Sequence, residues 1–90
     1  MTKADRCIVD SYNRAYKTKL SECYGTFSNK KYDAWEHCRD MMSRLGGQDI
    51  RIISHNGYQF TVGFKFEEDG HKYLMYISKS NYDGKKIRMD

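Results

Sequence analysis

The fold is decided by residues 56–70, which read NGYQFTVGFKFEEDG. Aromatic or aliphatic side chains occupy every second position from Tyr58 to Phe66, with polar residues or glycine between them. This period of two is typical of a β-strand that buries one face. The Asn-Gly before the stretch and the Asp-Gly after it are favoured in two-residue hairpins, because both central turn residues need a positive φ. The stretch therefore predicts a strand over residues 58–67 between two hairpins.

The two turns also predict which residues pair, with neighbouring strands over residues 49–55 and 71–78. Ile53 is expected opposite Phe60, Phe64 opposite Met75, and Val62 opposite Ile77. One face of the sheet then carries the apolar residues Ile53, Tyr58, Phe60, Val62, Phe64, Phe66, Tyr73, Met75 and Ile77. Asp83-Gly84 predicts either a third hairpin, with residues 85–89 as a fourth strand, or a frayed basic tail.

Two helices are expected before the sheet, because apolar residues recur there at helical spacing. A first helix over residues 2–24 has the apolar positions Ile8, Tyr12, Ala15, Tyr16, Leu20 and Cys23, and a basic outer face of Lys3, Arg6, Asn13, Arg14 and Lys17. Gly25 is placed to end it. A second helix runs to about residue 45, with the stripe Tyr32, Trp35, Cys38, Met42 and Leu45, and ends at Gly46-Gly47.

These elements predict an α+β fold of one domain, residues 1–90. Two N-terminal helices are expected to pack on one face of a three- to four-stranded antiparallel meander sheet. Ninety residues leave no room for a two-domain enzyme. No apolar run approaches the roughly 18 residues of a membrane span, and no secretory signal begins the chain, so we expect a soluble cytoplasmic protein.

The charge is mildly basic, with 16 Lys and Arg against 12 Asp and Glu and a net charge of +4. This balance favours nucleic acid or an acidic protein surface as a partner, and it argues against an acidic mimic of DNA. The three cysteines are odd in number and show no CxxC spacing, which is typical of reduced thiols.

Two surfaces are candidates for partner binding. On the outer sheet face, Tyr76 lies opposite Gly63 between Lys65 and Lys72, an arrangement that suits base stacking beside phosphate contacts. Cross-strand packing and protection of the sheet edge would explain the same residues. Another reading gives this face a partly apolar patch for a protein partner or a second copy, formed by Ile50, Ile52, Leu74 and Tyr76.

The second surface is the basic outer face of the first helix, with Arg6, Arg14 and Lys17. A solvated helix face is the plain alternative. The candidate partner-binding residues are therefore Arg6, Arg14, Lys17, Lys65, Lys72 and Tyr76. A homodimer is compatible with either surface.

Chemistry-bearing residues are few. His55 and His71 lie at the two predicted hairpins, and His55 has Arg51 and Tyr58 close in sequence, a grouping that suits RNA cleavage by acid/base chemistry. The hairpin tips lie about 30 Å apart, so the two histidines cannot act as one pair. The set Cys7, Cys23, His37 and Cys38 is unlike any compact zinc module. We expect no catalytic residue, metal or cofactor.

Part of the chain resembles small phage and prophage proteins of unknown function. The resemblance covers roughly the last 57 residues, through residues 34–39, residues 51–57 with Phe60 and residues 63–64, and residues 75–78. Proteins of that kind include anti-CRISPR and other host-takeover inhibitors, which block a surface of a larger nucleoprotein. Residues 54–55 and 59–60 are also similar to HicA-type mRNA interferases, although Ile53 replaces their glycine and their C-terminal helix is missing.

These resemblances imply a non-enzymatic phage-type inhibitor that binds a host defence protein or nucleoprotein. The alternative is a small RNA-binding or RNA-cleaving module centred on His55. A third reading is a dimeric structural or regulatory protein.

Overall fold

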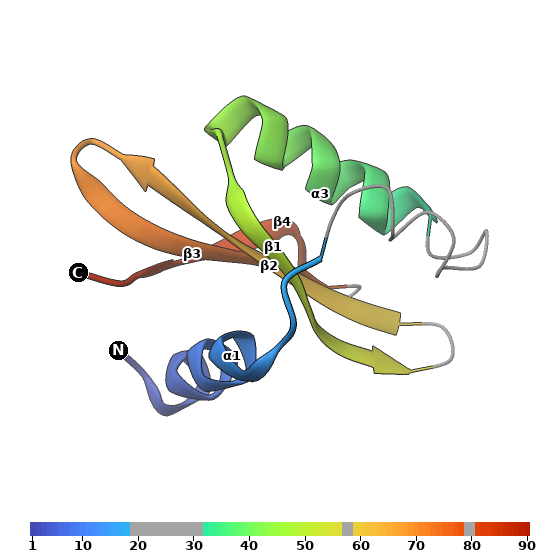
Figure 1. The fold of residues 1–90 in the computed structure, drawn as a ribbon, viewed down its shortest axis with the longest axis horizontal. Coiled ribbons are helices and arrows are strands. Elements are labelled where there is room, and N and C mark those ends of the chain that lie inside the picture. The colour runs from blue at the N-terminus through green and yellow to red at the C-terminus, as the bar shows by residue number, and fades with distance from the viewer. Residues whose placement is uncertain (19–31, 57–58, 79–80) are drawn as a thin grey trace.

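The fold is seen in a computed structural model that describes residues 1–18, 32–56, 59–78 and 81–90. Helices α1 (Lys3–Arg14) and α3 (Tyr32–Leu45) precede strands β1 (Gln48–Asn56), β2 (Gln59–Glu68), β3 (His71–Ser78) and β4 (Asn81–Arg88). The strands form one antiparallel sheet in the order β1-β2-β3-β4 (Figure 1). The predicted α+β meander is confirmed, and its fourth strand is present.

The two helices lie on opposite faces of the sheet, with α3 above it and α1 below it in Figure 1. Each helix packs against a separate apolar cluster. The prediction that both helices share one face is therefore wrong. The physical reason is that both faces of the sheet carry apolar side chains, and each must be removed from water by a layer of its own.

The α3 face holds the larger cluster. Its buried members are Cys38, Met42, Ile50, Val62, Phe64, Phe66, Met75 and Ile77. Cys38 and Met42 come from the predicted apolar stripe, so that part of the stripe is confirmed. The helix ends as expected at Gly46, whose φ of +65° suits glycine, and the N–H of Gly47 donates to the carbonyl of Met42.

The α1 face holds a smaller cluster, formed by Tyr12, Leu74 and Ile87. The partly buried residues packed against it are Ile8, Val9, Ile53, Tyr76 and Met89. The prediction that a patch on this face is open to a protein partner is therefore wrong, because α1 covers Leu74 and Tyr76. The other two patch residues, Ile50 and Ile52, belong to the opposite face.

The register between β2 and β3 is as predicted, with Phe64 opposite Met75 and Val62 opposite Ile77. The register between β1 and β2 is not. Phe60 pairs with His55 instead of Ile53, and irregularities interrupt the ladder between Ile52 and Ser54 and again nearer the start of β1. The offset is already present next to the turn, because β1 extends through Asn56, which pairs with Gln59. The irregularities then shift only the pairs farther along β1, each by an unpaired residue.

The first helix is also shorter than predicted, since α1 ends at Arg14. Ala15 is extended, with φ −75° and ψ 150°, and the chain then runs beside β1. Lys17 forms an antiparallel bridge with Arg51, and the N–H of Thr18 donates to the carbonyl of Ile50 at 2.8 Å. The predicted helix positions beyond Thr18, with the predicted stop at Gly25, lie outside the described residues.

The last strand begins earlier than predicted. Asp83-Gly84 lies inside β4 and not at a turn, so the predicted third hairpin is misplaced. Gly84 has a φ of +78° where the pairing of β3 with β4 shifts between Tyr76 and Ser78, a conformation found in the type of bulge that contains glycine. Neither helix in the described residues has the length and apolar character needed to cross a membrane.

Candidate anion-binding site

The site is built around the ring of Tyr12, which is fully buried on the inner side of α1. The ring packs against Gly63 of β2, where a Cβ would lie 2.9 Å from Cδ2 of Tyr12 and 2.8 Å from Cδ1 of Ile53. A side chain at position 63 would therefore push the ring away. Glycine at this position lets α1 approach the sheet closely.

Two cations lie over this ring. The guanidinium carbon of Arg51 is 4.6 Å from the ring centre, and Nζ of Lys65 is 5.7 Å from it. Both distances are within the range in which a cation is attracted to the face of an aromatic ring. Tyr12 thus holds two positive charges at the point where α1 meets β1 and β2.

The polar contacts of Tyr12 and Arg51 lock this arrangement. The hydroxyl of Tyr12 donates to the carbonyl of Asp49 at 2.5 Å. Burial raises the pKa of Tyr12 to about 12, against the opposing effect of the Arg51 charge. Nη1 of Arg51 donates to the carbonyl of Tyr12 at 3.0 Å and to that of Asn13 at 3.4 Å. The guanidinium therefore caps the C-terminal end of α1, where the helix dipole favours a cation.

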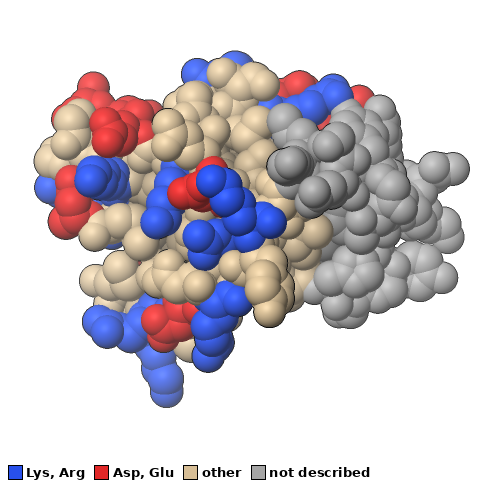
Figure 2. Space-filling view, in the orientation of Figure 1, with Lys and Arg blue, Asp and Glu red and all other residues tan. Residues whose placement is uncertain are grey.

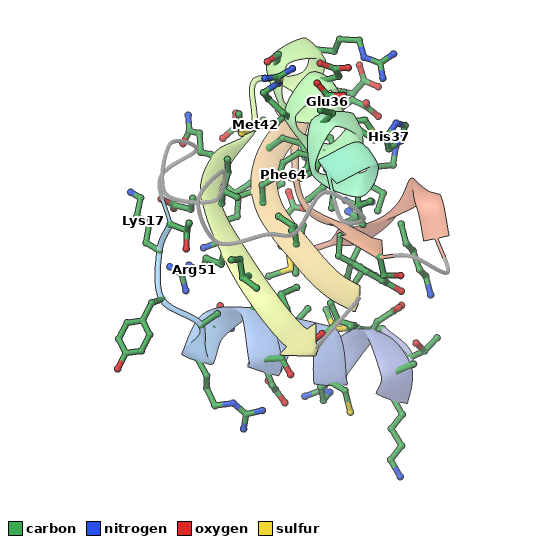
Figure 3. All side chains as sticks on the ribbon, turned by 90° about the vertical axis from the view of Figure 1, so that its right-hand side faces the viewer. Lys17, Glu36, His37, Met42, Arg51 and Phe64 are labelled. Carbon is green, nitrogen blue, oxygen red and sulfur yellow. The ribbon has the colours of Figure 1, made fainter. Side chains whose placement is uncertain are left out.

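A third cation comes from the extended segment after α1. Nζ of Lys17 lies 2.7 Å from a carboxylate oxygen of Asp49. The hydrogen bond from Lys17 holds the pKa of Asp49 below its usual value, and the charges of Lys65 and Arg51 add to this effect. One carboxylate therefore faces three cations, and we name Lys17, Arg51 and Lys65 the basic cluster. Figure 3 shows Lys17 and Arg51 beside each other near β1, away from α3.

Further cations lie on the outer side of α1, where Lys3, Arg6 and Arg14 are exposed. Arg14 is in the last turn of the helix, next in sequence to the segment that carries Lys17. Figure 2 shows Lys and Arg side chains gathered over the middle of this side of the molecule and again over α1. The candidate site therefore consists of two groups of cations, the basic cluster where α1 meets β1 and β2 and the exposed cations of α1.

The six predicted partner-binding residues fall into four groups. Lys17 and Lys65 belong to the basic cluster, and Arg14 lies three residues before Lys17 in the last turn of α1. Arg6 is exposed on α1, two turns before Arg14. Lys72 is also exposed, but it lines a separate cavity of about 420 Å³ beside Phe66 and Tyr73, near the C-terminal end of α3.

Tyr76, the remaining predicted residue, does not lie on an open surface. It is partly buried and packs against the cluster beneath α1. Base stacking at Tyr76 with Lys65 and Lys72 on either side, as the sequence suggested, is therefore blocked by the helix. The reason is again the position of α1 on the face that was expected to be open.

Sequence reasoning missed Arg51 and Tyr16 as surface residues of the site. Arg51 was considered only as a neighbour of His55. Tyr16 was placed on the buried side of a long helix, yet it is 92% exposed. The signal was present in the sequence, because Tyr16 is flanked by Arg14 and Lys17, a grouping more typical of a surface than of a core.

The predicted chemistry-bearing residues are dispersed where they are described. The side chains of His55 and Tyr58 lie outside the described part of the chain. His71 lies 3.5 Å from the carboxylate of Asp90. Among the described residues, Cys7 is exposed on α1 and Cys38 is buried under α3, and no group of three or more His, Cys, Asp or Glu side chains is arranged to hold a metal ion.

Comparisons of the chain with protein families, with curated proteins and with solved structures find no match.

Proposed function

We propose that this protein is a non-enzymatic inhibitor of the phage type, which binds a host nucleoprotein and blocks its working surface. The observation that supports the proposal is the basic surface formed by the basic cluster and α1. Such an inhibitor needs a rigid display of charged and aromatic anchors and no reacting group. Interfaces of this class cover about 800 Å² on each partner.

Rigidity is what distinguishes this surface from a solvated helix face. Lys17 is held by Asp49, and Arg51 is held by two backbone carbonyls at the end of α1. Cations fixed before binding lose less conformational entropy when they meet an anion. The basic surface is complementary to the nucleic acid of a nucleoprotein or to an acidic patch on its protein component.

The test is affinity capture from host extract, followed by assay of the captured nucleoprotein in the presence of the purified chain. We expect the wild-type chain to capture and inhibit a host nucleoprotein, and the triple reversal Arg6→Glu, Arg14→Glu and Lys17→Glu to do neither. His55→Ala is the control and should retain both properties. Inhibition that survives the triple reversal, or capture without inhibition, would overturn the proposal.

The RNA-cleaving alternative is tested by the same control. If His55→Ala abolishes activity while the triple reversal preserves it, a reaction at His55 replaces surface blocking as the explanation.

A further inference from the structure

Tyr16 is an aromatic residue displayed on a segment with fixed ends. Within the described residues, only Met1 and Tyr16 are large apolar side chains with high exposure, 64% and 92% respectively. The ring of Tyr16 is therefore accessible to a partner, and covering it on binding would be favourable.

The backbone around Tyr16 is anchored on both sides. Before it, the N–H of Ala15 donates to the carbonyl of Tyr12 at 3.1 Å. After it, Lys17 bridges to Arg51, and the Thr18 hydroxyl donates to the carbonyl of Tyr16 at 3.3 Å. The ring is therefore presented from a fixed backbone position.

The surroundings of Tyr16 are cationic. Lys17 follows it directly, Arg14 lies two residues before it, and Arg51 lies across the bridge from Lys17. Lys65 is exposed on β2, and its Nζ lies 5.7 Å from the centre of the Tyr12 ring, which Arg51 also contacts. Two described acidic residues are close to this group. Asp49 is already paired with Lys17, and Asp10 lies one turn before Arg14 on α1.

From this arrangement we propose that the chain binds single-stranded nucleic acid directly, with a base stacked on Tyr16 and the flanking phosphates held by Arg14, Lys17 and Lys65. Single-strand binding proteins combine these two elements, a cationic track for the backbone and an aromatic ring for the bases. The proposal deepens the proposed function and rests on it, because it identifies the nucleic-acid component of the target as what the basic surface contacts.

The observations favour single-stranded nucleic acid over a protein or a duplex. A protein interface has an apolar centre, whereas the large apolar residues described near Tyr16 are buried and its exposed neighbours are cations. A duplex presents its phosphates but keeps its bases stacked inside, so it would leave the ring of Tyr16 without a partner.

The first test is fluorescence anisotropy with labelled oligo-dT and oligo-U of 12 nucleotides, with a duplex of the same length for comparison. Tyr16→Ala should weaken single-strand binding roughly 5- to 150-fold, the equivalent of losing one stacked base. Tyr16→Phe should retain the affinity, since it retains the ring. Similar affinity for both oligonucleotides is expected, because neither stacking nor phosphate contact uses the 2′-hydroxyl; tighter binding of one identifies which of the two is the ligand.

The second test measures the salt dependence of binding. Arg14→Gln should reduce the slope of log K against log salt by about 0.7, the value for one phosphate contact on a single strand. Arg44→Gln is a matched control, since Arg44 is also an exposed arginine in the last turn of a helix but lies on α3. It should leave the slope unchanged.

A third variant makes binding tighter. Asp49→Asn removes the negative charge at the centre of the basic cluster, whose repulsion of a phosphate outweighs the anchoring that it gives Lys17. Asparagine tolerates the positive φ of 54° at this position. Oligonucleotide affinity should rise several-fold. An unchanged or lower affinity in a folded Asp49→Asn chain would contradict the placement of the phosphates.

The outcomes separate this inference from the proposed function. If Tyr16→Ala leaves oligonucleotide binding unchanged but abolishes capture of the host nucleoprotein, Tyr16 contacts a protein, and the single-strand inference is overturned while the inhibitor proposal stands. If oligonucleotides bind as expected but no nucleoprotein is inhibited, the inhibitor proposal fails and the nucleic-acid site stands. Equal affinity for duplex and single strand, unaffected by Tyr16→Ala, overturns the stacking contact.

Discussion

The two faces of the sheet differ in what they bury. The α3 face encloses a dense apolar cluster that includes Phe64, Phe66 and Met42. The α1 face buries a smaller cluster that includes Tyr12. There the helix contacts the sheet through hydrogen bonds and through cations that lie over the Tyr12 ring. The comparison indicates a division of labour, in which the α3 face supplies most of the stability and the α1 face supplies the charged surface.

The largest effect on stability is expected from Phe64→Ala on the α3 face. Phe64 is fully buried, and removing a buried phenyl ring typically costs 3 to about 5 kcal/mol, through lost transfer free energy and the cavity left behind. Urea unfolding measures this loss. Oligonucleotide affinity of the folded fraction should stay unchanged, and a parallel loss of affinity would show that the two faces are not separable.

A smaller loss is expected from Gly63→Ala on the α1 face. The added methyl group would press on Tyr12 and Ile53, and overpacking of this kind costs about 1 to 3 kcal/mol. Gly47→Ala is the matching variant on the α3 face, where the added Cβ would press on the ring of Phe64 and the side chain of Met42. Urea unfolding should show both losses, but only Gly63→Ala should also weaken oligonucleotide binding, because only it displaces the ring beneath the basic cluster.

Tyr12→Phe should cost less again, about 0.5 to 1.5 kcal/mol, because it removes one hydrogen bond to the carbonyl of Asp49 and keeps the ring. The pKa of Tyr12 is raised from 10.0 to about 12 in the folded chain, so its contribution is complete below pH 10 and is lost as the pH rises through about 12. When tyrosinate absorbance is followed against pH, the step at the highest pH should be absent in Tyr12→Phe. A highest step that survives the substitution would show that Tyr12 is not the buried phenol.

The smallest effect is expected where α1 meets β4. Nζ of Lys85 lies 2.9 Å from the carboxylate of Asp5, and their hydrogen bond lowers the pKa of Asp5 and raises that of Lys85. Because the pKa of Asp5 is lowered, its stabilisation is present above the ordinary value of 3.8 and is lost as the pH falls through the folded value. Thermal melting of Asp5→Asn should differ little from wild type at neutral pH, and less in high salt, because Lys85 is exposed although Asp5 is mostly covered. A large, salt-insensitive loss would contradict a solvent-screened ion pair.

The sequence was a good guide where local signals determine the structure. Asp69-Gly70 predicts the turn between β2 and β3, both residues have a positive φ, and the pairing of Phe64 with Met75 follows from it. Gly46 likewise marks the end of α3. These features depend on a few adjacent residues, so residue type and spacing are sufficient to predict them.

The sequence was a poor guide where distant contacts decide. The apolar spacing of Ala15 and Tyr16 continues the helical period, but the chain leaves the helix because Thr18 and Lys17 bond to β1 more than thirty residues away. The face of the sheet on which α1 packs depends on how Tyr12 fits over Gly63. Neither the spacing of apolar residues nor the charge pattern of the sequence reveals this fit. For the candidate site, Lys17 and Lys65 were identified as basic surface residues, but their meeting with Arg51 around Tyr12 needed the fold.

The central claim is that the surface around Tyr16 and the basic cluster, and not the α3 side, contacts the anionic partner. Backbone amide chemical shifts recorded during titration with oligo-dT test it most directly. The account predicts that the shifts concentrate on residues 14–18 and 49–51 and at Lys65, while Asp40, Ser43 and Arg44 on the exposed side of α3 stay unchanged. Shifts centred on α3, with residues 14–18 unaffected, would contradict it.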